Sequence, residues 1–282
     1  MKELRGKVAV ITGAGSGIGR ALALACASEG MGVALADIDE PGMAETVRLL
    51  EPSGAAVLTQ RCDVADSAAV ERLADAAWTR FGATHLVFNN AGVGVAGPMW
   101  TTTLDDWEWT LGINLMGVVH GVRSFVPRML EAKLEGRIVN TASAAGLTSV
   151  PGSSVYCVTK HAVVTMSECL AHELDLVQAA IGVSVLCPAF VPTGIAESER
   201  NRPAALGDKN PLAARYEEFT RKAVQAGRLT ADDVARITLE GVRAGRFYIL
   251  PHPKIKNAVE TRMRDILDDR APTNVVREFI KA

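Results

Sequence analysis

The sequence predicts a single-domain α/β protein with a seven-stranded, doubly wound parallel sheet flanked by helices. Short apolar runs rich in β-branched residues alternate along the chain with longer segments that have helical periodicity. The short runs are apolar throughout, which is typical of strands buried on both faces. Regular alternation of strand and helix favours a parallel sheet with helices on both sides.

Each element is predicted from local signals. A glycine cluster separates the first strand from the first helix, Pro41 opens the second helix in its first turn, and Asp66 or Ser67 is suited to cap the third. Strands are expected at 7–12, 32–37, 55–61, 85–88, 136–141, 182–187 and 247–250. Helices are expected at 17–29, 41–50, 67–80, 105–133, 154–178 and 231–243.

One segment, residues 194–229, interrupts the alternation with two prolines, three glycines, many charges and weak periodicity. It follows the carboxyl end of the sixth strand, where open α/β sheets bind ligands. A long irregular insertion at such a place is usually functional, so we expect it to cover a substrate; a solvated loop is the alternative. The tail after Leu250 carries charges typical of a solvated or interface helix.

Composition limits the possible functions. The chain has 282 residues, 48% of them hydrophobic and 22% charged, with a net charge of -2, which does not favour nucleic-acid or membrane binding. Five cysteines without a C-x-x-C pair argue against disulfides and a zinc site, and we expect no metal. The absence of a signal-like or membrane-spanning apolar run leads us to expect a cytoplasmic protein.

A glycine-rich stretch, TGAGSGIG at 12–19, joins the first strand to the first helix. Glycines allow the backbone to approach a pyrophosphate, and the helix N-terminus offers free N–H groups. The spacing is neither G-x-G-x-x-G nor a P-loop, and a purely structural turn is the alternative. The residues expected to bind phosphate are Gly13, Ser16, Gly17, Ile18 and Gly19.

Asp37 ends the second strand, 18 residues after Gly19. A carboxylate at this place accepts hydrogen bonds from adenosine ribose hydroxyls and repels a 2′-phosphate. Ile38, the next residue, supplies no positive charge for such a phosphate. The sequence therefore favours NAD over NADP, with a surface acid as the weaker interpretation.

Tyr156 and Lys160 lie four residues apart on one expected helix, so their side chains can converge. We expect the ammonium to lower the pKa of the phenol and to fit it for acid–base catalysis near neutral pH. Ser143, 13 residues before Tyr156, is placed to hold a reacting oxygen. Asn114 lies inside a helix, where asparagine is unfavourable; it is either a harmless misfit or binds water or backbone in a proton relay.

Five motifs follow one another along the chain: TGAGSGIG at 12–19, Asp63-Val64 after the third strand, NNAG at 89–92, the helical Asn114, and Ser143 with Tyr156-x-x-x-Lys160. On these motifs the chain resembles the short-chain dehydrogenase/reductase family from Lys7 to about Leu250. The resemblance implies a Rossmann fold, with Tyr156 as acid/base, Ser143 as substrate ligand, Lys160 as ribose ligand and Asn114 as anchor of a water relay. It also implies a dimer or tetramer packed through the helices at 105–133 and 154–178. Further cofactor contacts implied by the resemblance are Asp63, Val64, Asn90, Ala91, Gly92, Pro188, Val191 and Thr193.

Two positions depart from the family pattern. His85 stands where the fourth strand usually begins with Asp, and a structural role is expected for it. Pro188-Ala189 replaces the usual Pro-Gly and is followed by the bulky Phe190. The stretches GVSVLCPAFVPTGIAESERNRP and RFYILPHP, with Trp107–Trp109, are also similar to a subgroup that oxidises benzylic alcohols of lignin-type aryl ethers.

The expected pocket is largely apolar, without a fixed Arg or Lys to bind a carboxylate or phosphate. We therefore predict an NAD(H)-dependent oxidoreductase that interconverts a hydrophobic secondary alcohol and its ketone. A cofactor-retaining epimerase or dehydratase and a non-enzymatic NAD(H) sensor are the alternatives. Besides segment 194–229, the expected pocket wall consists of Val93, Met99, Ala145, Leu147, Val150, Phe190 and Ile195.

Overall fold

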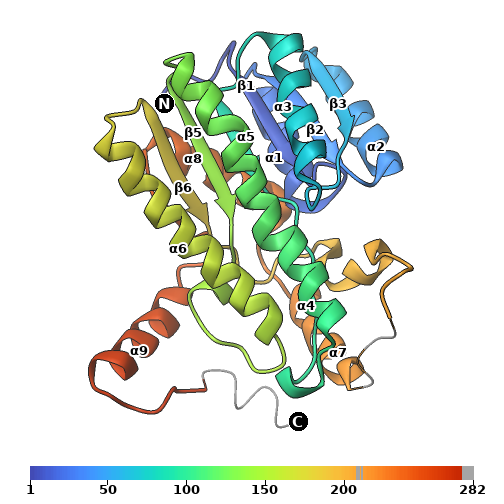
Figure 1. Cartoon of the computed structure of the whole chain (residues 1–282), viewed down its shortest axis with the longest axis vertical. Coiled ribbons are helices and arrows are strands. Elements are labelled where there is room, and N and C mark those ends of the chain that lie inside the picture. Colours follow the sequence, from blue (N-terminus) through green and yellow to red (C-terminus); the bar gives the residue numbers. More distant parts are fainter. Residues whose placement is uncertain (208–209, 211, 275–282) are drawn as a thin grey trace.

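Seven parallel strands form one sheet at the centre of the molecule in the computed structural model, which describes residues 1–207, 210 and 212–274 (Figure 1). The strands are β1 (Val8–Thr12), β2 (Gly32–Asp37), β3 (Val57–Arg61), β4 (Leu86–Asn89), β5 (Gly136–Thr141), β6 (Ile181–Leu186) and β7 (Tyr248–Ile249). Their order is β3-β2-β1-β4-β5-β6-β7. From β1 the sheet extends in one direction to β3, and from β4 it extends in the opposite direction to β7. The predicted doubly wound fold is therefore confirmed.

The helices alternate with these strands. The α-helices are α1 (Gly17–Ser28), α2 (Glu40–Leu50), α3 (Ser67–Phe81), α4 (Leu104–Leu111), α5 (Gly117–Glu131), α6 (Ser154–Leu176), α7 (Ala213–Gln225), α8 (Ala231–Arg243) and α9 (Ile255–Leu267). Short helical turns are η1 (Glu51–Ser53), η2 (Met99–Thr101), η3 (Gly112–Met116), η4 (Ala144–Gly146) and η5 (Gly194–Asn201).

The two faces of the sheet carry separate cores. Ala9 and Ile11 of β1 pack into a cluster with residues of α1, α2 and α8. Val10, between them, belongs to a cluster with residues of α3, α5 and α6 on the opposite face. Figure 1 shows this layering, with α5 and α6 in front of the strands and α1 and α8 behind. Every β1 residue is buried, because alternate side chains enter different cores.

The helix expected at 105–133 is continuous in space but not uniform. A single π-helical turn, η3, joins α4 to α5 and contains the buried Asn114. The helix continues through Pro127 and ends at Glu131. Such π turns insert an extra residue into a helix and redirect side chains. Helical periodicity predicted the helix, but it could not reveal the bulge.

The expectation that residues 194–229 are irregular is wrong for much of the segment. It contains η5 and the 13-residue α7. Periodicity missed α7 because only Ala213 and Val224 of this helix are buried, although its sequence AARYEEFTRKAVQ is rich in good helix formers. Parts of this segment and of the tail, namely 208–209, 211 and 275–282, lie outside the described residues. The tail contains α9, which Figure 1 shows beside the main body.

Several smaller expectations can be compared with the structure. His85 accepts a hydrogen bond from the Val8 N–H through Nδ1, at 3.1 Å, which confirms its structural role. All five cysteines are free thiols. Within the described part of the chain, no helix is long and apolar enough to span a membrane.

Candidate active site

A cavity of about 740 Å³ opens at the carboxyl ends of the strands, beside the switch between β1 and β4. It is lined by the loops that follow β1 to β6 and by parts of η5, α7 and α9. Of the residues expected to act in catalysis or cofactor binding, all but Asn114 line its wall. This position agrees with the rule that open α/β sheets bind ligands where the strand order reverses.

The glycine-rich stretch requires glycine at two positions because of close backbone approach. A Cβ on Gly19 would lie 2.0 Å from the Gly13 carbonyl oxygen, and one on Gly13 would lie 2.9 Å from Ala91 Cα. Gly13 and Gly17 also have positive φ values of 68° and 52°. Ser16 makes no side-chain cap to α1, and the first turn of α1 has no acidic residue. The helix therefore presents free N–H groups to the cavity, which fits a phosphate group.

Asp37 lies beside the glycine-rich stretch at the end of β2. Its carboxylate accepts hydrogen bonds from Gly15 N at 2.8 Å and Asp39 N at 3.0 Å. Sequence reasoning missed Arg20, whose guanidinium donates to the Gly15 and Gly42 carbonyls and to Thr46 Oγ1. This cation therefore already has acceptors within the fold.

Asn90 is held by two threonines that sequence reasoning did not assign to the site. Its N–H donates to Thr12 Oγ1 at 2.9 Å, and its Nδ2 donates to the Thr12 carbonyl at 3.0 Å. Thr141 Oγ1 donates to Asn90 Oδ1 at 3.3 Å. These bonds join the ends of β1, β4 and β5. Both threonines could have been identified from their positions in the sequence. Thr12 immediately precedes the first glycine of the turn, and Thr141 is the last residue of β5.

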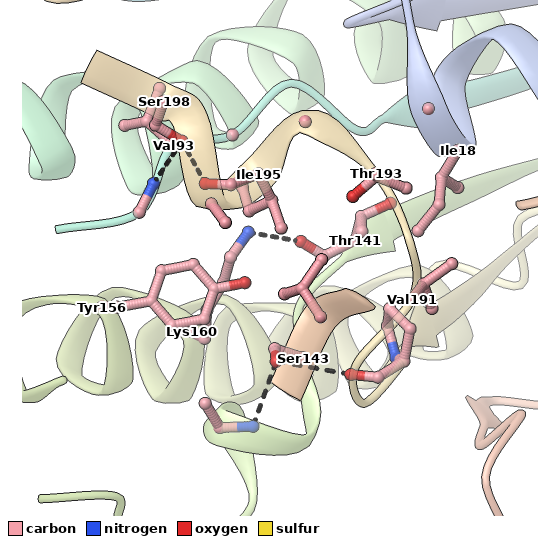
Figure 2. A pocket seen from close by; sticks show the side chains of 18 of the residues that line it. Ile18, Val93, Thr141, Ser143, Tyr156, Lys160, Val191, Thr193, Ile195 and Ser198 are labelled. Carbon is pink, nitrogen blue, oxygen red and sulfur yellow. Dashed lines mark hydrogen bonds between the residues drawn. The ribbon is translucent and has the colours of Figure 1, made fainter. Parts of the chain in front are cut away.

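Tyr156, Lys160 and Ser143 converge on the cavity (Figure 2). Lys160 Nζ lies 5.6 Å from the centre of the Tyr156 ring and donates to the Thr141 carbonyl at 2.9 Å. Ser143 Oγ donates to the Pro188 carbonyl at 3.4 Å and accepts from Ala145 N at 3.1 Å. The three side chains come from α6 and from the turn after β5, as the spacing predicted.

The expected effect of Lys160 on the pKa of Tyr156 is wrong for the protein without cofactor. Burial raises the pKa of Tyr156 to about 12, and a hydrogen bond with Ser143 opposes only part of that rise. Burial also lowers the pKa of Lys160 to about 8. Removal from water disfavours both charged forms, and this cost exceeds the attraction that the four-residue spacing suggested.

Asn114 is completely buried and does not line the cavity. Its Oδ1 accepts from Val93 N at 2.8 Å, while its Nδ2 donates to the Val93 carbonyl at 2.9 Å and to Thr159 Oγ1 at 3.2 Å. The amide thus pairs with both backbone groups of one residue, so Asn114 is not a harmless misfit. It fastens the loop after β4 to the long helix and to α6.

Most of the residues that the sequence predicted for the substrate pocket do line the cavity. Met99 and Leu147 are exceptions: Met99 is 58% exposed on η2, and Leu147 packs against a core cluster containing Val163. Arg200 and Lys254 also line the cavity, and the sequence did not predict them there; Arg200 Nη1 donates to the Gly194 and Glu197 carbonyls. The confirmed wall residues are Val93, Ala145, Val150, Phe190 and Ile195, and sequence reasoning missed Val95, Ala96, Phe219, Val224, Ile255 and Ala258.

His252 holds the backbone of the Pro188-Ala189 segment. Its Nδ1 accepts a hydrogen bond from Ala189 N at 3.1 Å, and it also lines the cavity. Burial lowers the pKa of His252, which favours the neutral ring that this acceptor role requires. Its place in RFYILPHP was part of a quoted resemblance, but its role was not predicted.

Comparisons with known proteins agree with this geometry. A family model described as short chain dehydrogenase matches residues 7–204. A CLA biosynthesis dehydrogenase/reductase of Lactiplantibacillus plantarum is 34% identical over 96% of this chain and 97% of its own length. A C alpha-dehydrogenase of a Sphingobium species is 32% identical over 96% of this chain and 89% of its own length.

This chain belongs to the short-chain dehydrogenase family. A solved short-chain dehydrogenase/reductase from Burkholderia phymatum, in complex with NAD, is 50% identical with a TM-score of 0.95, covering 97% of this chain and 98% of that one. LigO from Sphingobium, in its apo form, is 33% identical with a TM-score of 0.79, covering 95% of this chain and 90% of that one. This short-chain dehydrogenase is accordingly an oxidoreductase.

Proposed function

We propose that this short-chain dehydrogenase interconverts an apolar secondary alcohol and its ketone with NAD(H), using Tyr156 as the general acid and base. One observation carries the proposal. Tyr156 and Ser143 lie in a single cavity whose wall includes the glycine-rich turn and apolar side chains such as Val150 and Phe190. The glycine-rich turn at 13–19, which we call the phosphate cradle, therefore lines the same cavity as the apolar side chains and the hydroxyl groups of Tyr156 and Ser143.

The residues of the cradle fit a dinucleotide. The turn at 13–19 leaves no room for a Cβ at Gly19 and ends at the free N-terminus of α1. Asp37 lines the same cavity and is suited to accept bonds from ribose hydroxyls. Its negative charge supports a preference for NAD over NADP, because a 2′-phosphate would meet a carboxylate.

When bound, NAD⁺ supplies the hydride acceptor and a positive charge. In the oxidation direction, Ser143 and Tyr156 hold the substrate hydroxyl, and Tyr156 removes its proton. A neighbouring positive charge favours the phenolate, which offsets the rise in the pKa of Tyr156 caused by burial. Lys160 supports the phenolate and binds ribose, while Asn114 orders the backbone and water of the relay that returns the proton.

General acid–base catalysis of this kind contributes about 10²–10⁴-fold to the rate. Holding the alcohol beside the cofactor provides much of the remaining acceleration by making the reaction effectively unimolecular. In this proposal, segment 194–229 covers the substrate. Its support is that η5 and α7 both contribute side chains to the cavity wall, including Ile195 and Phe219.

The apolar compartment favours a hydrophobic substrate. The C alpha-dehydrogenase relative, together with the sequence resemblance noted above, supports a benzylic alcohol as a more specific candidate. Small charged alcohols should therefore have lower kcat/KM than apolar secondary alcohols.

Fluorescence titration with NADH and, separately, NADPH tests the cofactor part without knowledge of the substrate. We expect tighter binding of NADH; tighter binding of NADPH would contradict the argument from Asp37. Screening NAD-dependent oxidation of apolar secondary alcohols then tests the reaction. Net turnover would exclude a cofactor sensor and an epimerase or dehydratase, which regenerates its bound cofactor in each cycle.

We also propose that the protein is a cytoplasmic homo-oligomer that packs through the α4–α5 segment and α6, as the family resemblance implies. Exposed apolar side chains on these elements, Met116 and Val158, support such packing. The free thiols support a reducing compartment. Light scattering coupled to size-exclusion chromatography would distinguish a monomer from the expected dimer or tetramer.

A further inference from the structure

Ser198 connects η5 to the loop that follows β4. Its hydroxyl donates to the Ile195 carbonyl at 2.7 Å and accepts from Gly94 N at 2.9 Å. Ser198 is only 4% exposed, although it lines the cavity. Figure 2 shows it on the segment that passes Ile195 and Thr193, facing Tyr156 and Lys160 across the cavity. One buried hydroxyl therefore joins two walls of the site.

The loop bound by Ser198 is also held from the other side. Asn114 pairs with the N–H and the carbonyl of Val93, immediately before Gly94. Consecutive residues of one loop are thus fixed by a residue of the long helix and by a residue of η5. A displacement of Gly94 must be transmitted to Val93 through a single peptide unit, which is planar and stiff.

A second attachment fixes the end of η5. Arg202 Nη1 lies 2.7 Å from Asp106 Oδ1 on α4, and the side chains are only 8% and 3% exposed. The Arg202 guanidinium also lies over the Trp109 ring, 5.4 Å from its centre. Trp109 in turn packs against Val93 and Val95. The segment around η5, the loop after β4 and α4 are therefore joined by polar contacts and by a small apolar core.

We propose that Ser198 is a positioning residue for the reaction: it couples η5, on the substrate side of the cavity, to the loop held by Asn114. This inference rests on the proposed function, because its consequence is expressed in turnover. Contact between substrate and η5 is transmitted through Ser198 to Gly94 and Val93, and so to the Asn114 amide. Ser198 does not exchange a proton with substrate; it sets the position of the loop that Asn114 holds.

Replacing Ser198 by alanine removes the acceptor of the Gly94 N–H and leaves that partly buried donor without its protein partner. We expect kcat to fall about tenfold, the effect of losing roughly one such bond. NADH affinity should change little, because the phosphate cradle lies at the other end of the cavity. Ser198→Thr keeps the hydroxyl and should recover most of kcat. Ser28→Ala, at the exposed end of α1, is a matched control that should behave as wild type.

Hydrogen exchange gives a readout independent of activity. In Ser198→Ala, the Gly94 amide should exchange about tenfold faster, as expected for loss of roughly one hydrogen bond. A cycle with Asn114→Ala tests the coupling, because residues that act through one loop have non-additive effects on kcat. Additive effects, an unchanged Gly94 exchange rate, or a wild-type kcat in Ser198→Ala would each overturn the proposal.

The inference and the proposed function fail in different ways. If the wild type oxidises no alcohol with either cofactor, the proposed function fails, while the exchange measurement still tests the tie between Ser198 and Gly94. If the wild type is active but Ser198→Ala changes only KM or thermal stability, the positioning role is wrong. A drop in kcat with rescue by Ser198→Thr supports the role, because a purely structural defect would lower the active fraction and the folding stability together.

Discussion

The Lys160 ammonium lies 5.6 Å from the centre of the Tyr156 ring and gives its hydrogen bond to the Thr141 carbonyl. The two groups share one buried environment that opposes charge on each of them. Burial moves the pKa of Tyr156 up to about 12 and that of Lys160 down to about 8. Before cofactor and substrate arrive, the phenol is therefore neutral at pH 7, while Lys160 carries a charge that its burial disfavours.

Tyr156→Phe removes the proposed acid–base group and keeps the ring. We expect turnover to fall about 10²–10⁴-fold, the usual contribution of such a group. The dissociation constant for NADH should be nearly unchanged, because the phosphate cradle is intact. Steady-state kinetics and fluorescence titration of the same preparation provide the comparison. Full activity in this variant would remove Tyr156 from the mechanism.

Lys160→Met should abolish most activity and yet stabilise the protein without cofactor. Lowering the pKa from 10.5 to about 8 corresponds to roughly 3 kcal/mol against the charged form. Between pH 10.5 and about 8 the unfolded chain binds a proton at Lys160 that the folded protein does not bind. The free energy of unfolding therefore has its full value above pH 10.5 and decreases as the pH falls through about 8, so at pH 7 the buried ammonium destabilises the fold. Loss of the bond to Thr141 offsets about 1 kcal/mol of the gain.

Urea denaturation at pH 7 measures this effect as the free energy of unfolding. We expect an increase of about 1–2 kcal/mol in Lys160→Met after allowing for the lost hydrogen bond. The difference between variant and wild type should shrink as the pH is raised through 8, where Lys160 loses its proton. A less stable variant at pH 7 would show that the bond to Thr141 outweighs the cost of burial.

Asp37→Asn tests the cofactor preference with little change in shape. The amide oxygen can still accept from Gly15 N, but the negative charge is lost. The ratio of NADPH to NADH dissociation constants should fall about tenfold, as expected from losing a charged hydrogen bond and a repulsion. Asp66→Asn, at the N-cap of α3, is the control and should leave the ratio unchanged. An unaltered ratio in Asp37→Asn would contradict the proposed role.

Acid should destabilise the fold through His252 and His85. Burial lowers the pKa of both below 6.5, and both accept a backbone N–H through Nδ1. Their contribution to stability is fully present above pH 6.5 and is lost as the pH falls through the lowered values. His252→Asn keeps an acceptor that does not titrate, so its unfolding free energy should fall less between pH 7.5 and pH 5.5. Equal losses in variant and wild type would argue against this role.

The position of the site could be predicted because it follows from local patterns. Gly13 and Gly19 lie between a strand and a helix, and Tyr156 and Lys160 share a helix face. Parallel strands bring their carboxyl ends to one edge of the sheet, so residues that follow different strands meet there. The same logic did not identify α7, because only Ala213 and Val224 of that helix are buried.

The parallel sheet, the glycine-rich turn and the hydroxyl, phenol and amine groups at the sheet edge all follow from local patterns of residues. The surroundings of these groups depend on contacts between distant parts of the chain. Whether Asn114 binds water or backbone depended on a π turn that faces Val93, and the partners of Ser198 and His252 lie far away in sequence. The shifts in the pKa of Tyr156 and Lys160 were set by removal from water, which depends on the packing of the whole domain rather than on the spacing of two residues.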